Sequence, residues 1–257
     1  MIQNFLYILF CCFSLNTILS AQNNNGSTLS SGLNNNKYEL LVGGGVHTTG
    51  FQVKAAFGLV YNPKRTGNIV LEFGEIKDPS ERQQTYDGLS IVGGAPKSFI
   101  YGKRNNLYQS RFVYAEKLYL SDKNNRAISL GLSYAAGFSL GMLRPYYLDL
   151  IYRNNVGIPT ITAEKFSQEN QFKFLNPQEV DGPSGITYGW DELSLYPGFC
   201  FKAGLLVDWG ASDSILKDIE VGVAADIYFS DIPLMVFEAQ TPVFFNIFLN
   251  VHLGHRW

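Results

Sequence analysis

Cysteine is nearly absent, and the positions of the three that occur exclude a disulfide framework. Cys11 and Cys12 lie in an apolar N-terminal segment, which leaves Cys200 alone in the rest of the chain. A lone cysteine can form neither an intramolecular disulfide nor a cysteine-based metal site. We therefore expect no cysteine crosslink once the N-terminal segment is removed.

Charge is also scarce. Charged residues make up 16% of the chain, against roughly 25% in ordinary soluble domains, and the net charge of −2 gives no reason to expect a nucleic-acid partner. Aromatic residues are abundant instead, at 14%, with 15 Tyr, 19 Phe and 25 Gly. This composition is typical of strands that face lipid and end in aromatic girdles, although a soluble β-sandwich could share it.

Long apolar runs are absent after residue 21, so no later segment is expected to be a transmembrane helix. Residues 1–21 have an apolar core followed by small and polar residues, which predicts a secretory signal peptide cleaved after Ala21. The segment lacks Lys and Arg and would place Leu19 three residues before the cleavage site. An uncleaved anchor is the alternative, and a lipoprotein site at Cys11 or Cys12 fits less well because bulky residues precede both.

Residues 22–36 are rich in Asn, Ser and Gly and predict a disordered lead-in. Residues 37–257 then form the remaining domain. Its last stretch, 244–257, alternates strictly, with Phe245, Ile247, Leu249 and further apolar residues at every second position. A period of two predicts a strand with one face in an apolar medium and the other in a wetter one.

Seven earlier stretches show the same period, some less regularly. They cover residues 38–46, 51–61, 69–73, 107–120, 126–139, 199–209 and 219–229. Most are longer than the roughly 5–6 residues common in soluble sheets and suit a tilted bilayer crossing. No proline interrupts them, and their polar faces carry more charge than a sandwich core tolerates. We therefore predict a closed antiparallel transmembrane β-barrel of eight strands.

The connections between these stretches alternate in length. Residues 62–67, 122–125 and 211–216 form short turns, whereas the connections on the opposite side, 75–106, 140–198 and 230–243, are long. Short periplasmic turns and long external loops are the expected asymmetry of such barrels. Only the first external connection, 47–50, is short against this trend.

The start YELLVGGGVHTTGF, the stretch GLVYNPKRTGNIVLEFGEIKDPSERQ and the ending HLGHRW give the chain a family resemblance. It resembles the small eight-stranded outer-membrane barrels of the OmpA/OmpX type, and among them uncharacterised barrels of Bacteroidota. The resemblance implies a bacterial outer-membrane location, contact with lipid and lipopolysaccharide, and no settled activity. It also implies that the barrel-assembly machinery reads the alternating C-terminus, for which the signal residues would be Phe245, Leu249, Leu253 and Trp257.

With the apolar faces towards lipid, the charged residues of the strands fall in the lumen. This predicted lumen network comprises Glu39, Lys54, Glu72, Arg111, Lys117, Lys202, Asp208, Asp218, Glu220, Asp226 and Arg256. An eight-stranded interior is just wide enough for side chains to fill it. We expect opposite charges to pair into a plug, because a buried charge is tolerated only when it is paired. A narrow gated channel is the alternative and would need a gap in the network.

Candidate chemistry is sparse. His47, followed by Thr48 and Thr49, is predicted at the external rim, where a histidine could act as general base to a nucleophile in a lipid-modifying enzyme. A polar cap is the simpler interpretation. His252 and His255 are predicted on opposite faces of one strand and cannot easily share a metal. We expect no metal site and no cofactor.

Two loop features suggest contacts outside the barrel. Lys103, Arg104, Asn105 and Asn106 suggest a solvated loop or a contact with lipopolysaccharide phosphate. The loop 140–198 is too long and too aromatic for plain disorder, and its candidate partner-binding residues are Arg144, Tyr146, Tyr147 and Trp190. It could cover the barrel mouth, bind another outer-membrane subunit, or pack only on itself.

These observations favour a non-enzymatic function. The expected role is a structural or adaptor subunit of the outer membrane, such as one in a secretion or envelope-assembly complex. A barrel enzyme that modifies lipid A or phospholipid is the first alternative, and a small pore is the second.

Overall fold

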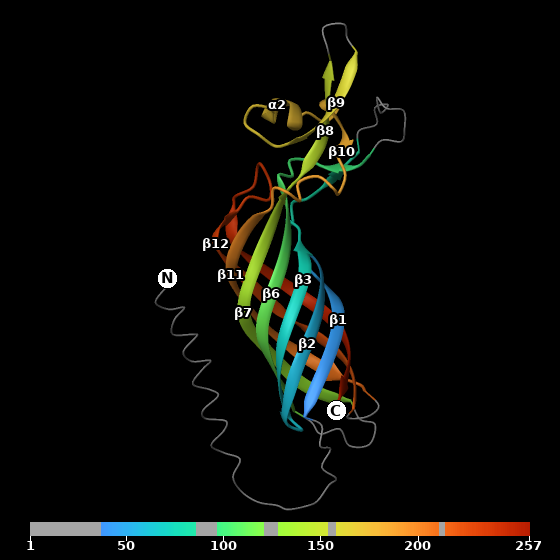
Figure 1. The fold of residues 1–257 in the computed structure, drawn as a ribbon, viewed down its shortest axis with the longest axis vertical. Coiled ribbons are helices and arrows are strands. Elements are labelled where there is room, and N and C mark those ends of the chain that lie inside the picture. The colour runs from blue at the N-terminus through green and yellow to red at the C-terminus, as the bar shows by residue number, and fades with distance from the viewer. Residues whose placement is uncertain (1–36, 86–96, 121–127, 154–157, 211–213) are drawn as a thin grey trace, which may run out of the picture. The chain divides into compact units, whose positions relative to one another are not determined.

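The computed structural model describes residues 37–85, 97–120, 128–153, 158–210 and 214–257. The predicted signal peptide and the lead-in at 22–36 lie outside these residues, as do Cys11 and Cys12. The regular structure of the described residues is almost entirely β, and eight strands form one closed barrel in the order β1-β13-β12-β11-β7-β6-β3-β2 (Figure 1). They are β1 (Tyr38–His47), β2 (Gly50–Asn62), β3 (Arg65–Ile76), β6 (Asn105–Tyr119), β7 (Ser129–Pro145), β11 (Ser194–Asp208), β12 (Ile215–Ile232) and β13 (Thr241–Arg256).

Every neighbouring pair in the ring is antiparallel, and the first and last strands close it. Glu39 of β1 lies opposite Arg256 of β13, and His47 lies opposite Phe248 at the other end of the same ladder. The prediction of a closed antiparallel barrel of eight strands is confirmed. Because closure leaves no edge strand, each strand of the ring pairs with a neighbouring strand on both sides.

The strands are longer than the sequence pattern indicated. β12 has 18 residues and β7 has 17, so the two longest external connections shrink from 75–106 and 140–198 to 77–104 and 146–193. The expectation that no proline interrupts a strand was wrong, since Pro197 lies within β11 and Pro242 within β13. The β11–β12 ladder begins only at Gly198, which leaves Pro197 outside the doubly paired part of its strand.

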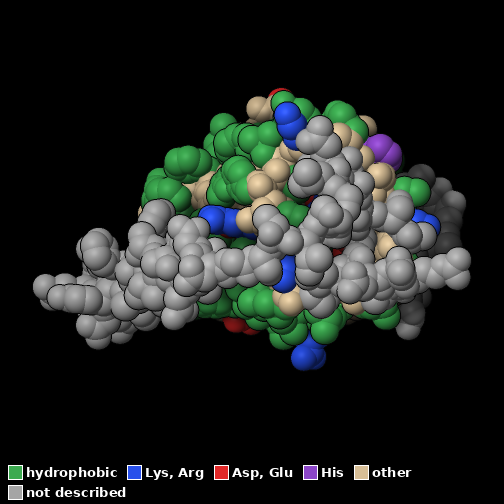
Figure 2. All heavy atoms as spheres, turned by 90° about the horizontal axis from the view of Figure 1, so that it is seen from below, with side chains coloured by type: hydrophobic (Ala, Val, Ile, Leu, Met, Phe, Trp, Pro, Cys, Tyr) green, Lys and Arg blue, Asp and Glu red, His purple; other side chains and the backbone are tan. Residues whose placement is uncertain are grey.

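Apolar side chains cover the outside of the ring. Val42, Leu71, Phe138, Leu205 and Phe245 are each more than half exposed, and hydrophobic side chains also gather over the visible wall seen from below (Figure 2). In water such a belt would forfeit roughly 25 cal/mol for every Å² of apolar surface left uncovered. Strands that are apolar outside, polar inside and closed into a ring are the arrangement of a bilayer-spanning barrel.

The lumen is not uniformly polar. An apolar cluster fills the end of the ring at which β3, β7 and β12 end, and it includes Ile76, Leu107, Leu143, Tyr228 and Phe244. A second cluster, which includes Leu41, Val70, Val113, Cys200 and Leu216, lies among the inward-facing residues. The interior is therefore packed by apolar as well as charged side chains.

A second, separate group of elements lies between β7 and β11. β8 (Tyr147–Arg153) pairs with β9 (Pro159–Lys165) and with β10 (Val180–Pro183), and the short helices α2 (Gln171–Phe174) and η1 (Pro177–Glu179) connect β9 to β10. β4 (Gln83–Gln84) and β5 (Phe99–Ile100) form a two-stranded sheet in the preceding external connection. Among the described residues, no helix has the length and apolar character needed to cross a membrane.

This external unit, defined as β5 together with residues 146–153 and 158–193, has a hydrophobic core of its own. Phe99, Leu148, Leu150, Phe174 and Val180 are each at most 3% exposed and pack together. The long loop therefore packs on itself and on Phe99 of the preceding external connection. Its core joins two external connections that are distant in sequence.

Candidate functional site

The candidate site is the polar lumen of the barrel. Ten of the eleven side chains of the predicted lumen network are buried, and Lys54 is the partly exposed exception. The register places their positions on the inner side of the strands, because each alternates with exposed apolar residues. The contacts below show which of them the fold brings together.

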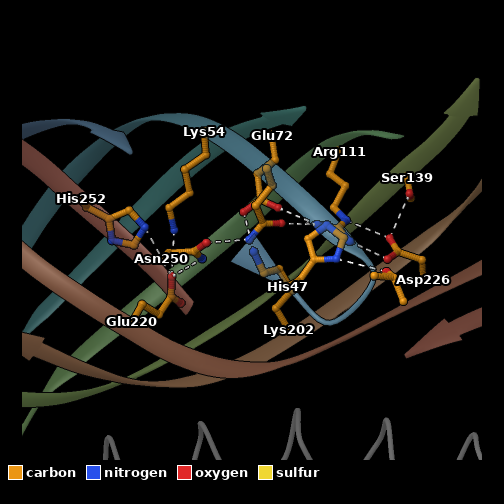
Figure 3. Close-up of polar contacts among 12 residues, drawn as sticks. His47, Lys54, Glu72, Arg111, Ser139, Lys202, Glu220, Asp226, Asn250 and His252 are labelled. Carbon is orange, nitrogen blue, oxygen red and sulfur yellow. Dashed lines mark hydrogen bonds and ion pairs between the residues drawn. The ribbon is translucent and has the colours of Figure 1, made fainter. Parts of the chain in front are cut away.

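Arg111 of β6 lies at the centre of the network (Figure 3). Its guanidinium donates two hydrogen bonds to the Asp226 carboxylate of β12, with Nε–Oδ1 and Nη2–Oδ2 distances of 2.9 and 2.6 Å. Nη1 donates to Glu72 of β3 at 3.1 Å and to Gln52 of β2 at 2.9 Å. A planar guanidinium suits this fork, which ties together strands from opposite sides of the ring.

Glu72 is shared between two cations. Its other carboxylate oxygen accepts a hydrogen bond from Lys202 Nζ at 2.6 Å. The Lys202 ammonium also lies 4.5 Å from the centre of the Phe248 ring, within the range of a cation–π contact. Both charges are almost fully buried, so their pairing offsets much of the cost of removing them from water.

A second group of contacts surrounds Glu220 of β12. Lys54 Nζ donates to its carboxylate at 2.8 Å, and the Ser133 hydroxyl donates to the other oxygen at 2.5 Å. Asn250 donates to Glu220 at 3.4 Å and accepts from Gln52 at 2.7 Å. Through Asn250 and Gln52, this group is continuous with the Arg111 group (Figure 3).

The network continues towards the end of the barrel that holds the chain's C-terminus. Asp218 accepts a hydrogen bond from Lys117 Nζ at 2.9 Å and binds the Nδ1 atom of His252. The other ring nitrogen of His252 lies 3.7 Å from Glu220. Nearest that end, Arg256 donates to Glu39 at 2.9 Å and to the Tyr119 hydroxyl at 3.0 Å.

Asp208 makes a different kind of contact. Its Oδ1 atom accepts the backbone N–H of Gly210 at 2.8 Å, and therefore helps to form the turn after β11. Cys200 is fully buried among the inward-facing residues. Within the described part of the chain, no group of three or more His, Cys, Asp or Glu side chains could hold a metal ion.

The polar partners of these charges were missed by reasoning from charge alone. They are Gln52, Ser133, Ser139, Asn250 and His252. Each has the inward parity of its strand, so the two-residue period could have identified them. Together they form hydrogen bonds with donor and acceptor atoms of the charged groups that the ion pairs do not use. The lumen is therefore a connected polar network.

One ion pair lies on the opposite face of the wall. Glu116 is next to inward-facing Lys117 and points outwards, where it binds Arg65 and accepts the Tyr134 hydroxyl. Tyr114 and Tyr61 contact each other nearby through their hydroxyls at 3.4 Å. An outward charge near a strand end, surrounded by tyrosines, is typical of the membrane interface.

His47 lies at the last position of β1 and is 9% exposed. Its Nδ1 atom lies 3.2 Å from the Thr49 hydroxyl. That hydroxyl donates to Asn246 Oδ1 at 2.5 Å, and Thr48 donates to the same atom at 3.2 Å. Because the Thr49 proton is directed to Asn246, the imidazole is not placed to remove it, and the geometry fits a polar cap better than a nucleophile and base.

All four candidate partner-binding residues make contacts within the chain. Arg144 donates to the Ile186 carbonyl at 2.7 Å and is 7% exposed, and the Tyr146 hydroxyl accepts the backbone N–H of Ile100 at 3.3 Å. The Tyr147 hydroxyl donates to Glu192 at 2.9 Å. Trp190 alone of the four keeps 46% of its surface exposed.

The contact between Tyr147 and Glu192 shifts both groups. Burial and the hydrogen bond to Glu192 raise the pKa of Tyr147 to about 12. Hydrogen bonds from Lys165 and Tyr147 hold the pKa of Glu192 below its usual range. Both residues belong to the external unit.

The expectation of a solvated or phosphate-binding loop at 103–106 was wrong for three of its four residues. Lys103, Asn105 and Asn106 are each at most 8% exposed. Lys103 pairs with Glu81 at 2.8 Å, and Asn105 donates to the Pro233 carbonyl at 2.7 Å. The sequence could not show this, because the β12–β13 connection that covers these residues is more than 120 positions away in the chain.

The four residues of the proposed assembly signal all lie on the outer side of β13 or directly after it. Phe245, Leu249, Leu253 and Trp257 are 76%, 44%, 59% and 50% exposed. The backbone of Trp257 pairs with Tyr38 and so continues the β1–β13 closure.

No protein family and no curated protein matches the chain. Among solved structures, it is similar to Neisserial surface protein A, with 8% identity over 88% of this chain and 100% of that chain and a TM-score of 0.38. It is similar to the N-terminal β-barrel domain of Pseudomonas aeruginosa OprF, with 9% identity, coverage of 85% and 97%, and a TM-score of 0.34. It is also similar to the attachment invasion locus protein Ail of Yersinia pestis, with 7% identity, coverage of 86% and 99%, and a TM-score of 0.37.

Proposed function

We propose that this chain is an integral, non-enzymatic barrel of the bacterial outer membrane that acts as a structural or adaptor subunit. The observation that carries the proposal is the combination of an apolar exterior with a lumen filled by paired charges. The exterior requires lipid, and closed β-barrels of this kind are the outer-membrane solution to spanning a bilayer. The filled lumen favours a scaffold over a transport path.

The external unit supplies the surface that an adaptor needs. Its own hydrophobic core keeps it folded beyond the strands, so it can present fixed side chains. Phe172 of α2 is 84% exposed, and the neighbouring Lys173 bonds back to the Ile151 carbonyl at 2.9 Å. Exposed aromatic side chains, including Phe, are enriched at protein interfaces relative to the rest of the surface. The partner we propose is another outer-membrane subunit, as in a secretion or envelope-assembly complex.

Two measurements, made one after the other, test this proposal. Fractionation and heat-dependent mobility on gels should place a folded barrel in the outer membrane. A photo-crosslinking amino acid at position 172 should then give a discrete protein adduct in intact cells. The same group in place of Phe112, a lipid-facing residue of β6 that is 53% exposed, serves as the matched control and should give none.

The outcomes separate the two parts of the proposal. Recovery of the chain in the aqueous fraction without detergent would refute the membrane barrel. A correctly inserted barrel with no reproducible adduct at position 172 would refute the adaptor role at this surface. An adduct at both positions would indicate nonspecific capture and would also count against it.

A further inference from the structure

A segment of the external unit returns to the outer wall of the barrel. Trp190 stacks on Tyr108 of β6 with ring centres 5.5 Å apart. The Arg144 guanidinium lies 5.0 Å from the centre of the Trp190 ring and 5.6 Å from that of Tyr108. Arg144 Nη1 and Trp190 Nε1 both donate to the Ile186 carbonyl at 2.7 Å. These contacts fix the turn 186–190 against the barrel.

The contacted part of the wall belongs to the lipid-facing side. Tyr108 stacks on Phe73 with ring centres 6.3 Å apart, and Phe73 is one of the exposed residues of the apolar belt. In the ladders, Tyr108 lies opposite Glu75 of β3 and Met142 of β7. Glu75 is the first charged outward residue of β3 after the apolar run, so this row marks the external edge of the belt.

The segment extends the apolar belt beyond this edge. Ile186, Tyr188 and Trp190 are 71%, 46% and 46% exposed, and Leu195 at the start of β11 is 61% exposed. Left in water, such a group would be an unusual exposed apolar patch. Trp and Tyr are enriched where a membrane meets water, because their rings have an apolar body and a polar atom.

Glycine allows the chain to make this return. Gly189, directly before Trp190, has φ +81°, and a Cβ atom there would lie 3.0 Å from the Pro145 carbonyl oxygen. Gly185, directly before Ile186, has φ +103°. Residues other than glycine rarely adopt these conformations, so the two glycines permit the turn that stacks Trp190 on the wall and leaves the Ile186 side chain exposed.

We propose that residues 186–190 form a loop-borne membrane anchor that inserts Ile186 and Trp190 into the headgroup region of the outer leaflet. The occupant of this surface is membrane lipid, because the patch is continuous with the belt that lipid already covers. The anchor rests on the membrane location given under the proposed function, and it adds a lipid contact for the external unit. Arg144 holds the indole in place, because its guanidinium lies within 5.6 Å of both ring centres and donates to the same Ile186 carbonyl as the indole N–H.

Fluorescence quenching by brominated lipid tests the anchor on the full-length barrel. Trp209 and Trp257 are the other two tryptophans of the chain, and Trp209→Phe with Trp257→Phe leaves Trp190 as the sole emitter. In phosphatidylcholine vesicles brominated near the headgroup, this variant should lose emission relative to unbrominated vesicles. Adding Ile186→Ser should reduce that loss, because a polar residue weakens insertion.

A second variant separates this proposal from the membrane location itself. Trp190→Phe with Trp257→Phe leaves only Trp209, which is 40% exposed after the other end of β11. Quenching of both single-tryptophan proteins supports the anchor. Quenching of Trp209 but not of Trp190 by brominated lipid overturns the anchor and leaves the barrel in the membrane. This holds if acrylamide then quenches Trp190, which would show that it is exposed to water. It also holds if acrylamide does not, which would show that a second protein copy covers it. Quenching of neither overturns both.

Discussion

Arg111 and Asp226 form a two-point ion pair across the barrel lumen, with Nε–Oδ1 and Nη2–Oδ2 distances of 2.9 and 2.6 Å. The two side chains are 1% and 0% exposed. They come from β6 and β12, which are not neighbours in the ring. The pair therefore joins two walls that no backbone ladder connects, and it should stabilise the closed ring directly.

Removing both members of this pair should cost less than the two single removals added together. Arg111→Met leaves the Asp226 carboxylate buried without its cation, and such a loss costs about 3–5 kcal/mol of unfolding free energy. Asp226→Asn is the second single variant. In the double variant Arg111→Met/Asp226→Asn, the orphaned charge is gone, so the loss should be clearly smaller than the sum of the two single losses. Urea unfolding in lipid vesicles, followed by tryptophan emission, measures all three.

Lys97→Met provides the control for this cycle. Lys97 lies 4.0 Å from Asp149, and its side chain is 57% exposed. Surface pairs of this kind contribute about 0–1 kcal/mol, so the variant should unfold close to the wild type. Strict additivity of the two lumen substitutions would show that the ion pair makes no coupled contribution.

The barrel should not conduct ions, even when part of its polar network is removed. Glu72→Ala/Lys202→Ala deletes one buried ion pair but leaves the apolar cluster that includes Leu107, Tyr228 and Phe244. An apolar constriction excludes water and hence ions. We expect no unitary steps in planar bilayers from the wild type or from this double variant.

Removing both the buried ion pair and the rings of the apolar cluster should allow the barrel to conduct ions. Adding Tyr228→Ala and Phe244→Ala to the network variant removes the two largest rings of the apolar cluster. Steps are then expected, provided that the gel assay shows a folded barrel. Defined steps from the wild type would instead favour the pore interpretation of the lumen.

The local sequence pattern was enough to predict the ring of strands but not the apolar side chains that close its lumen. Period-two alternation predicts both faces of strands such as β13, because lipid and lumen impose opposite requirements on neighbouring residues. The apolar closure by Phe244 and Tyr228 was missed because inward positions were assumed to be polar. Contacts such as that of Lys103 with Glu81 depend on how separate loops fold together, and no short-range pattern records that.

The contact between Tyr147 and Glu192 should hold only within a pH window. Glu192 has a folded pKa below its ordinary value of 4.5, so its contribution is present above that value and is lost as pH falls through the lowered pKa. Tyr147 has its pKa raised from 10.0 to about 12, so its contribution is complete below pH 10 and is lost as pH rises through about 12.

The sole-Trp190 protein reports this window, because Trp190 lies two residues before Glu192 in the same turn. Its emission should be constant between these limits and change beyond each. Glu192→Gln should remove the acidic transition, and Tyr147→Phe should remove the alkaline one. Survival of the acidic transition in Glu192→Gln would assign it to a different group. The effect on global stability should be small, since the Glu192 side chain is 34% exposed and solvent screens its contacts.

Alanine substitution should destabilise the barrel at one of two adjacent glycines of β1 and be tolerated at the other. Gly43 faces the lumen, where an added Cβ would lie 2.5 Å from the Val251 carbonyl oxygen and would also contact the His252 ring. Gly43→Ala must push His252 away from Asp218, and overpacking of this kind costs about 1–3 kcal/mol. At outward-facing Gly44, the nearest atom would be the Gln52 carbonyl oxygen at 3.5 Å, an ordinary contact. Gly44→Ala should therefore be tolerated, and equal losses in urea unfolding would show that strand propensity dominates over the lumen contact.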